Sequence, residues 1–330
     1  MRIVVYGAGG IGCYVGGRLA AAGTSVTFVG RQRVADELAV HGLRLTDYRG
    51  ADLRVPEVRV ETTPAAAAEA DLVLVTVKSA ATGTAAAELA GVLKPGAVVV
   101  SFQNGLRNGE VLKARLGEQT VVTGMVPFNV LNRGEGVFHQ GTEGALDVQR
   151  DAALTPYLDA FAAAGLPLTQ HDDIVPVQWA KLLLNLNNPI NALSNLPLRD
   201  ELSQRAYRQC LALAQAETLK LLDAAGIEPA QLLAIPMHRF PMVLRLPDFL
   251  FRRVAGKVLA VDPLARTSMW EDLEAGRATE IDYLNGEVVR LADSLGRSAP
   301  VNRRLVELIR AAETARRAWS GPGLLRELQR

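Results

Sequence analysis

The sequence predicts an α/β protein with an N-terminal, doubly wound and mostly parallel sheet, followed by an all-helical C-terminal domain. Up to about residue 170, short apolar runs alternate with helical segments and are bounded by Gly and Pro. This pattern is typical of a sheet covered by helices on both faces. Beyond residue 170 strand-like alternation stops and long amphipathic segments dominate. A chain of 330 residues suits two domains, which we expect at 1–170 and 171–330.

The first element predicts a nucleotide site. An apolar run from Arg2 to Tyr6 is followed at once by Gly7-Ala-Gly-Gly-Ile-Gly12, and apolar residues then recur at helical spacing. A strand, a tight glycine turn and a helix open a Rossmann-type βαβ unit, in which the helix N-terminus holds a pyrophosphate. The alternative is an ordinary glycine-rich turn. We expect five residues of this turn to bind the cofactor: Gly7, Gly9, Gly10, Ile11 and Gly12.

The second strand indicates which dinucleotide is bound. Ser25 to Val29 is apolar, and Gly30-Arg31-Gln32-Arg33 follows it. An NAD site usually carries Asp or Glu there, to accept hydrogen bonds from the ribose. A guanidinium instead pairs with a 2′-phosphate. We therefore predict NADP(H), with Arg31 as the first contact and Arg33 as the second, against the alternative of two solvated arginines.

The rest of the chain follows the same two-part plan. We expect further strands at 71–77, 97–101 and 120–126, helices at 65–70, 85–93 and 151–164, and an antiparallel hairpin punctuated by glycines at 134–136 and 141–144. The second half predicts helices at 174–193, 200–225, 263–275, 280–295 and 301–318. A helical domain beside a nucleotide-binding domain predicts a cleft for a small substrate.

Composition excludes several classes of function. The 36 basic and 35 acidic residues give a net charge of +1, which offers no case for binding nucleic acid or an anionic membrane. Cys13 and Cys210 are isolated and the four histidines are scattered, so we expect neither a disulfide nor a metal site. Without a membrane-spanning run or room for a signal peptide before residue 2, we expect a cytoplasmic protein.

A polar cluster marks the start of the helical half. Lys181, Asn185 and Asn188 stand at i, i+4 and i+7, which predicts one shared helix face. Asparagine is a poor helix former, so several in one short stretch are costly unless they bind something. An ammonium flanked by amides suits a 2-oxo acid. The alternative is a surface lysine with local asparagine capping.

A second polar segment runs from Arg266 to Gly286 and includes Ser268, Thr279 and Glu280. Thr279 could cap a new helix, with Glu280 and Asp282 complementing its N-terminus. Capping would explain a carboxylate at 280, but not why so many polar groups crowd one connection.

Together these segments resemble the ketopantoate reductase (2-dehydropantoate 2-reductase) family over essentially the whole chain. The matching motifs are the glycine turn, Val77-Lys78, Asn104-Gly105, Trp179-Ala-Lys181-Leu-x-x-Asn185 and Thr279-Glu280-Ile-Asp-Tyr-Leu-Asn-Gly286. The resemblance implies a Rossmann domain, a helical C-terminal domain and NADPH-dependent reduction of a 2-oxo acid. The first substrate to expect is 2-dehydropantoate, which yields pantoate for pantothenate and coenzyme A biosynthesis.

The resemblance also implies roles for individual residues. Lys181 matches the catalytic lysine, and Glu280 matches the carboxylate that binds a substrate hydroxyl and orients that lysine. Ser268 matches a serine that contacts the substrate carboxylate, and Asn185 matches a substrate-side amide. Asn188 or Asn191 would be the second such amide. The residues implied on the cofactor side are Arg31, Lys78, Asn104 and Glu280, of which Asn104 also links to the substrate.

Some departures leave the substrate open. Many family members carry a Thr-Thr-His-like stretch where this chain has Met125 to Asn129, and Ala265 replaces an often polar residue. The 226–263 region is long, and its apolar, basic stretch from Phe240 to Arg253 could be a packed helical excursion or a membrane or partner contact. Alternatives are therefore another branched 2-oxo acid, a β-hydroxyacid dehydrogenase-like reaction, or a non-enzymatic NADPH sensor. The sequence leaves a homodimer open.

Overall fold

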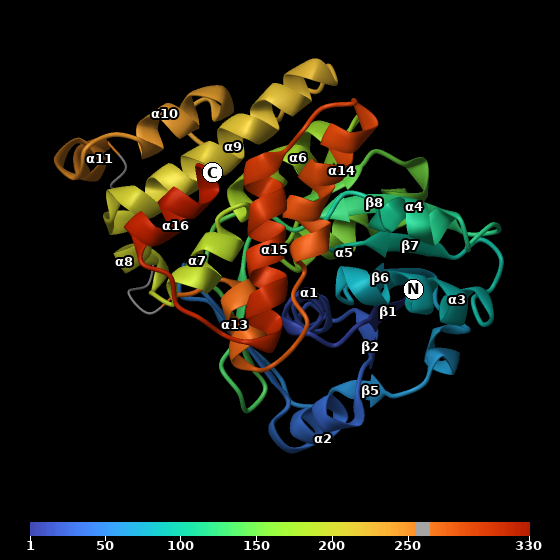
Figure 1. Ribbon diagram of the computed structural model, residues 1–330. Coiled ribbons are helices and arrows are strands. Elements are labelled where there is room, and N and C mark those ends of the chain that lie inside the picture. The colour runs from blue at the N-terminus through green and yellow to red at the C-terminus, as the bar shows by residue number, and fades with distance from the viewer. Residues whose placement is uncertain (255–264) are drawn as a thin grey trace. The chain divides into compact units, whose positions relative to one another are not determined.

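The computed structural model describes residues 1–254 and 265–330. The chain divides into two compact units, Met1–Ile174 and Val175–Arg330. Their α/β and helical characters confirm the predicted fold class, and Figure 1 shows the elements of each unit.

An eight-stranded sheet forms the centre of the first unit. Its strand order is β12-β11-β8-β7-β6-β1-β2-β5, and every neighbouring pair is parallel except β8 with β11. Five of the strands, β1, β2, β6, β7 and β8, match strands expected from the sequence, whereas β5 was not expected. The order β5-β2-β1 is the 3-2-1 order of a dinucleotide-binding half. The strands are β1 (Arg2–Tyr6), β2 (Ser25–Val29), β5 (Arg59–Glu61), β6 (Leu72–Val75), β7 (Val98–Ser101), β8 (Thr120–Met125), β11 (Leu146–Gln149) and β12 (Leu168–His171).

Both faces of this sheet are buried. In β1, Ile3 and Val5 belong to one apolar core, while Val4 and Tyr6 belong to the other. The same alternation along β6 and β7 explains why these strands are continuously apolar. Five helices accompany the sheet: α1 (Gly10–Ala21), α2 (Gln32–His41), α3 (Thr82–Ala90), α4 (Asn108–Lys113) and α5 (Leu158–Ala163).

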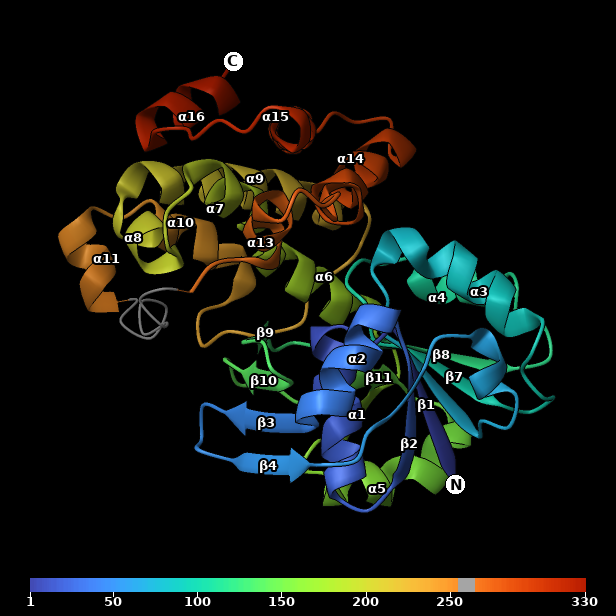
Figure 2. The same cartoon turned by 90° about the horizontal axis from the view of Figure 1, so that it is seen from below.

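A second, four-stranded sheet was not expected from the sequence. Its order is β4-β3-β10-β9, and it packs against α1 (Figure 2). The glycine-marked hairpin is present as β9 (Val130–Asn132) and β10 (Val137–Gln140), but it joins β3 (Leu43–Asp47) and β4 (Asp52–Val55) rather than the main sheet. A Cβ at Gly136 would lie 2.1 Å from the carbonyl oxygen of Gly42, so the two strand pairs meet where only glycine fits.

Two expected helices of the first unit are shorter or tighter than predicted. The alanine-rich segment forms the 3-10 helix η1 (Pro64–Ala67). The segment at 151–164 is a 3-10 helix, η3 (Ala152–Tyr157), followed by α5. Pro156 lies inside η3 and cannot donate an α-helical hydrogen bond, which accounts for the division.

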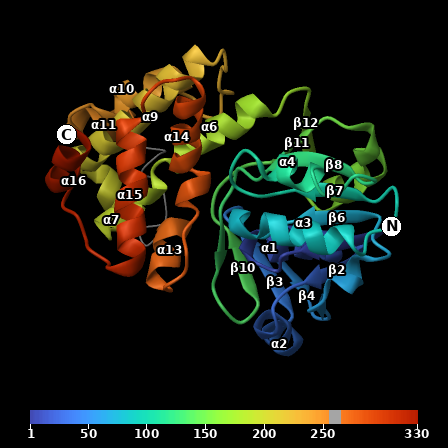
Figure 3. The same cartoon turned by 45° about the vertical axis from the view of Figure 1, so that its right-hand side comes forward.

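The second unit is all-helical in its described residues, and Figure 3 shows α14 and α15 side by side. The helix expected at 263–275 begins at Ser268, and residues 263–264 of it lie outside the described part. The helices are α6 (Val175–Asn185), α7 (Asn188–Ser194), α8 (Leu198–Ser203), α9 (Arg205–Ala224), α10 (Phe240–Leu244), α11 (Asp248–Val254), α13 (Ser268–Glu274), α14 (Asn285–Ser294), α15 (Pro300–Thr314) and α16 (Gly321–Leu328), with the 3-10 helices η4 (Met237–Arg239) and η5 (Ile281–Tyr283).

The described part of the 226–263 region packs as a helical excursion of the second unit. Arg208 of α9 is fully buried and donates to the carbonyl oxygens of Leu244 and Leu246 at 3.2 and 2.8 Å. It also pairs with Asp248 at 2.8 Å and stacks on Phe251, so one guanidinium holds α10 and α11 against α9. Residues 255–263 of the region lie outside the described chain. No described helix is long and apolar enough to cross a membrane.

Candidate active site

The glycine turn has the geometry that a dinucleotide requires. Gly7 has φ +119°, which favours glycine, and a Cβ at Gly12 would lie 2.2 Å from the carbonyl oxygen of Gly7. A Cβ at Gly9 would meet no atom within 4 Å, so the space in front of the α1 N-terminus is open. The first turn of α1 carries no acidic residue, and its N-cap, Gly9, makes no side-chain cap. These residues fit a pyrophosphate on the helix N-terminus.

The two candidate arginines after β2 differ in their contacts. Arg31 is the N-cap of α2, and no hydrogen bond or ion pair joins its side chain to any other residue within 1–254 and 265–330. Arg33 lies two residues on and pairs with Glu37 at 3.7 Å on the same helix. Arg31 is therefore the better placed cation for a phosphate, and Arg33 has a structural use.

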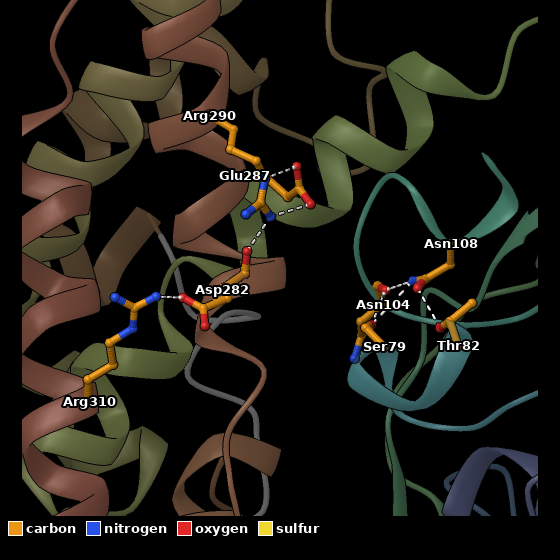
Figure 4. A network of polar contacts seen from close by, with 8 residues as sticks. All are labelled: Ser79, Thr82, Asn104, Asn108, Asp282, Glu287, Arg290 and Arg310. Carbon is orange, nitrogen blue, oxygen red and sulfur yellow. Dashed lines mark hydrogen bonds and ion pairs between the residues drawn. The ribbon is translucent and has the colours of Figure 1, made fainter. Parts of the chain in front are cut away.

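Lys78 and Asn104 follow two adjacent strands of the sheet. Lys78 is exposed and is the N-cap of a short 3-10 helix, η2 (Ser79–Ala81). The carbonyl oxygen of Asn104 accepts from Ser79 Oγ at 2.8 Å and from Asn108 Nδ2 at 2.5 Å (Figure 4). These bonds join the turns that carry Lys78 and Asn104, which fixes both at the carboxyl edge of the sheet.

Four buried polar residues of this network were not predicted. Gln103 Nε2 donates to the Val77 carbonyl oxygen at 2.9 Å and to Thr82 Oγ1 at 2.7 Å, and Thr82 donates to Asn108 Oδ1 at 2.8 Å. These residues could have been predicted from their position in the sequence, because polar residues that follow apolar strands lie where a doubly wound sheet binds its ligands. The four are Ser79, Thr82, Gln103 and Asn108, all buried.

Lys181 lies on α6, one turn before Asn185. Burial lowers the pKa of Lys181 from 10.5 to about 8. The expectation that Asn188 shares this helix face is wrong, because α6 ends at Asn185 and α7 begins at Asn188. Pro189 has no N–H to donate to the Asn185 carbonyl oxygen, so the α-helical hydrogen bonding stops there.

The structure distinguishes Asn188 from Asn191. Asn191 is fully buried, and its Nδ2 donates to Glu201 Oε2 at 2.7 Å and to the Leu196 carbonyl oxygen at 3.0 Å. Its Oδ1 accepts from the backbone N–H of Thr267 at 3.1 Å. Asn191 is thus committed to structure, whereas the half-buried Asn188 makes no side-chain hydrogen bond to another described residue.

Ser268 is the first residue of α13 and is exposed. The side chain of Thr267 caps this helix by accepting from the Trp270 N–H at 3.4 Å. Because Thr267 also donates to Asn191 Oδ1 at 3.2 Å, α7 holds the end of α13 that presents Ser268. Arg266 lies over the Trp270 ring at 4.1 Å.

Glu280 occupies the N-cap position of the 3-10 helix η5, between α13 and α14. Its side chain makes no capping hydrogen bond, contrary to the capping interpretation. Thr279 does accept from the Ile281 N–H at 3.4 Å, and its own N–H and hydroxyl both donate to Glu313 at 2.8 Å. Asp282 lies in the first turn of η5, as expected, and also pairs with Arg310 at 2.7 Å (Figure 4).

The residues after Glu280 enter a buried network. Asn285 is fully buried, and its Nδ2 donates to Asn302 Oδ1 at 2.9 Å. Asn302 donates from Nδ2 to Glu217 at 2.8 Å, and Glu217 also accepts from the Val301 and Asn302 N–H groups. The α9 carboxylate thus caps α15 and fixes the start of α14, five residues after Glu280.

A Rossmann-type unit followed by a helical unit that carries a half-buried lysine of lowered pKa defines a class of nucleotide-dependent oxidoreductase. The comparisons name the family within that class. The model "Ketopantoate reductase PanE/ApbA" matches residues 3–152, and its C-terminal counterpart matches residues 173–313. The chain therefore belongs to the ketopantoate reductase family.

Relatives and solved structures agree with this assignment. The 2-dehydropantoate 2-reductase of Halobacterium salinarum is 31% identical over 95% of this chain and 99% of its own length. A PanE/ApbA family ketopantoate reductase from Ralstonia eutropha JMP134 has a TM-score of 0.82 and 31% identity, covering 96% of this chain and 99% of its own. D-mandelate dehydrogenase, solved with NADH and anilino(oxo)acetate, shares the fold at a TM-score of 0.77 and 20% identity, over 95% and 98% of the two chains.

Proposed function

We propose that the protein reduces 2-dehydropantoate to pantoate with NADPH, in pantothenate and coenzyme A biosynthesis. The observation that carries the proposal is Lys181, whose pKa burial lowers to about 8 in a chain of this family. An ammonium with that pKa is protonated at neutral pH and acidic enough to donate. The cytoplasmic location, the homodimer and the division of labour between the two units remain predictions.

NADPH would be held by the glycine turn and by Arg31, with Lys78, Asn104 and Glu280 as the further contacts of the proposed site. When bound, its nicotinamide supplies a hydride to the carbonyl carbon. Arg31 supports NADPH over NADH, because residues 30–33, directly after β2, include no carboxylate that would repel a 2′-phosphate.

The chain's own residues would supply the proton and hold the substrate. Lys181 Nζ gives its proton to the carbonyl oxygen as the alkoxide develops. Ser268 binds the substrate carboxylate, while Asn185 and Asn188 bind its polar groups. Glu280 accepts from the substrate hydroxyl and orients Lys181.

A second candidate is a reductase of another bulky 2-oxo acid. The fold shared with D-mandelate dehydrogenase favours it, as does Met125–Asn129. A panel of 2-dehydropantoate, its deoxy analogue and phenylglyoxylate, assayed by cofactor absorbance with NADPH and NADH, separates the two. We expect wild type to prefer 2-dehydropantoate over the deoxy analogue by at least about tenfold, and Glu280→Gln to lose that preference. A higher kcat/KM for phenylglyoxylate would establish the second candidate instead.

A further inference from the structure

A pocket within the helical unit has none of the proposed site residues in its lining. Its volume is 840 Å³, and α9, the end of α10 and the connection from α14 to α15 line it. Figure 1 shows these helices, and α9 contacts α10, α14 and α15 directly. Lys181, Asn185, Ser268 and Glu280 do not line it.

The polar lining of this pocket is mostly cationic. Lys220, Arg245 and Arg297 all line it, and none of their side chains forms an ion pair with a residue in 1–254 or 265–330. Glu217 is the one lining carboxylate, and it is already engaged by the Val301 and Asn302 N–H groups at 3.0 and 2.9 Å. Three unpaired cations around one pocket complement an anion.

The remaining wall indicates an organic molecule rather than a bare ion. Leu213, Ala216, Leu221 and Val301 supply apolar surface beside the cations. Arginine pairs equally well with carboxylate and phosphate oxygens, so the shared chemistry is a multivalent anion with an apolar body.

The same pocket is connected to the segment that carries Glu280. Glu217 accepts from Asn302 Nδ2 at 2.8 Å, and Asn302 Oδ1 accepts from Asn285 at 2.9 Å. An anion drawn in by the three cations would repel the Glu217 carboxylate. The cap of α15 and the start of α14 would respond first, because Glu217 holds both.

We propose that this pocket is a regulatory site for an organic anion that changes the activity at Glu280 through Glu217, Asn302 and Asn285. The regulatory part depends on the proposed function, whereas the binding part does not. A ligand can shift activity only by binding two states of this network unequally, so binding and kinetics must both be measured.

Calorimetric titration at fixed ionic strength tests binding, with citrate as the carboxylate probe and pyrophosphate as the phosphate probe. We expect one saturable site with a Kd at or below about 1 mM for at least one probe. Lys220→Ala and Arg297→Ala should each weaken it about tenfold. Arg199→Ala removes an exposed charge outside the pocket, and Gly9→Ala places a methyl at the pyrophosphate position of the cofactor site, so neither should change binding in this pocket. No saturable binding, or equal weakening in Arg199→Ala, would overturn the site, and loss of binding in Gly9→Ala would assign the probe to the cofactor site.

Steady-state kinetics then tests regulation. The saturating probe should change kcat/KM for 2-dehydropantoate at least about threefold in wild type and leave Arg297→Ala unaffected. Binding with unchanged kinetics would overturn the regulatory role. An absence of turnover without any probe would instead overturn the proposed function, and the calorimetric result would still decide the site.

Discussion

Burial lowers the pKa of Lys181 to about 8, and this value predicts how the reaction responds to pH. Only the ammonium can donate the proton, so reduction should be insensitive to this group below pH 8. Above that pH the rate should fall about tenfold per pH unit. The profile of kcat/KM checks this, and a folded Lys181→Arg variant that retains activity should lose the alkaline decline, because arginine stays protonated. An unchanged decline in that variant would assign the titration to another group.

Arg31 should select the phosphate of NADPH. Removing a bidentate charged contact costs about 2 kcal/mol, so Arg31→Ala should weaken NADPH binding more than tenfold and NADH binding little. Arg33→Ala is the matched control, since Arg33 is paired with Glu37 on the surface of α2. Fluorescence titration of both cofactors gives the four affinities. A preference that survives Arg31→Ala, or that falls equally in Arg33→Ala, would remove the assignment.

At the scale of elements, two glycines of the turn between β1 and α1 should have different roles, Gly9 in cofactor binding and Gly12 in folding. Ala at Gly9 meets no protein atom, so Gly9→Ala should cost at most about 1 kcal/mol of stability. Its methyl would nevertheless stand where the pyrophosphate approaches, so NADPH affinity should fall at least about tenfold.

Gly12→Ala places its Cβ 2.2 Å from the Gly7 carbonyl oxygen and should lower the free energy of unfolding by about 1–3 kcal/mol or more. Thermal unfolding without cofactor and NADPH titration measure the two effects. Full affinity in Gly9→Ala would contradict the pyrophosphate site.

The junction of α7 with α8 contains a fully buried acid, Glu201, and burial raises its pKa from 4.5 to about 8. Because the folded state holds the Glu201 proton more tightly than the unfolded state, protonated Glu201 contributes stability that is fully present below pH 4.5. This contribution is lost as the pH rises to about 8, where Glu201 ionises. The ionised Oε1 has no hydrogen-bond partner among the described residues. Glu201→Gln keeps the shape and removes the charge. Its free energy of unfolding should exceed that of wild type by about 1–3 kcal/mol at pH 8, and the two should agree near pH 4.5.

Denaturant unfolding at the two pH values measures the difference, and Asp200→Asn is the control because Asp200 is exposed in the same helix. Equal pH slopes for wild type and Glu201→Gln would show that folding does not raise the pKa of Glu201.

Some elements could be predicted from sequence because one local rule decides them. The segment from Arg2 to Val29 follows from an apolar strand, a glycine turn and a helix with apolar residues at helical spacing. The predicted strand at 25–29 matches β2 residue for residue. β3 and β4 pair with each other as a local hairpin, but they were missed because both strands are short and half-exposed. Their connection to the rest of the small sheet runs through β10, a partner far along the chain. The break between α6 and α7 could have been predicted only if the helix-breaking effect of Pro189 had been given more importance than the helical spacing of Lys181 and Asn185.

At the scale of the whole molecule, some residues of the candidate site could be predicted from sequence and others could not. Lys181, Glu280 and the glycines were predicted from motifs that a single sequence carries. The buried polar networks of the two units were not predicted, because Gln103, Asn108, Asn191 and Asn302 bond to partners that only folding brings close. The asparagines in the Lys181 segment cannot be told apart in sequence. In the structure the Asn191 side chain bonds to Glu201, whereas the Asn188 side chain makes no hydrogen bond to another described residue.

The most direct test of the account is kcat/KM for 2-dehydropantoate with NADPH, measured on wild type and Lys181→Ala in the same assay. We expect wild type to exceed about 10⁴ M⁻¹s⁻¹, the lower end for natural substrates. Lys181→Ala should be about two to four orders of magnitude slower while binding NADPH normally. Wild-type turnover near background, or a folded Lys181→Ala variant with near-normal kcat/KM, would contradict the central claim that Lys181 drives NADPH-dependent reduction of this 2-oxo acid.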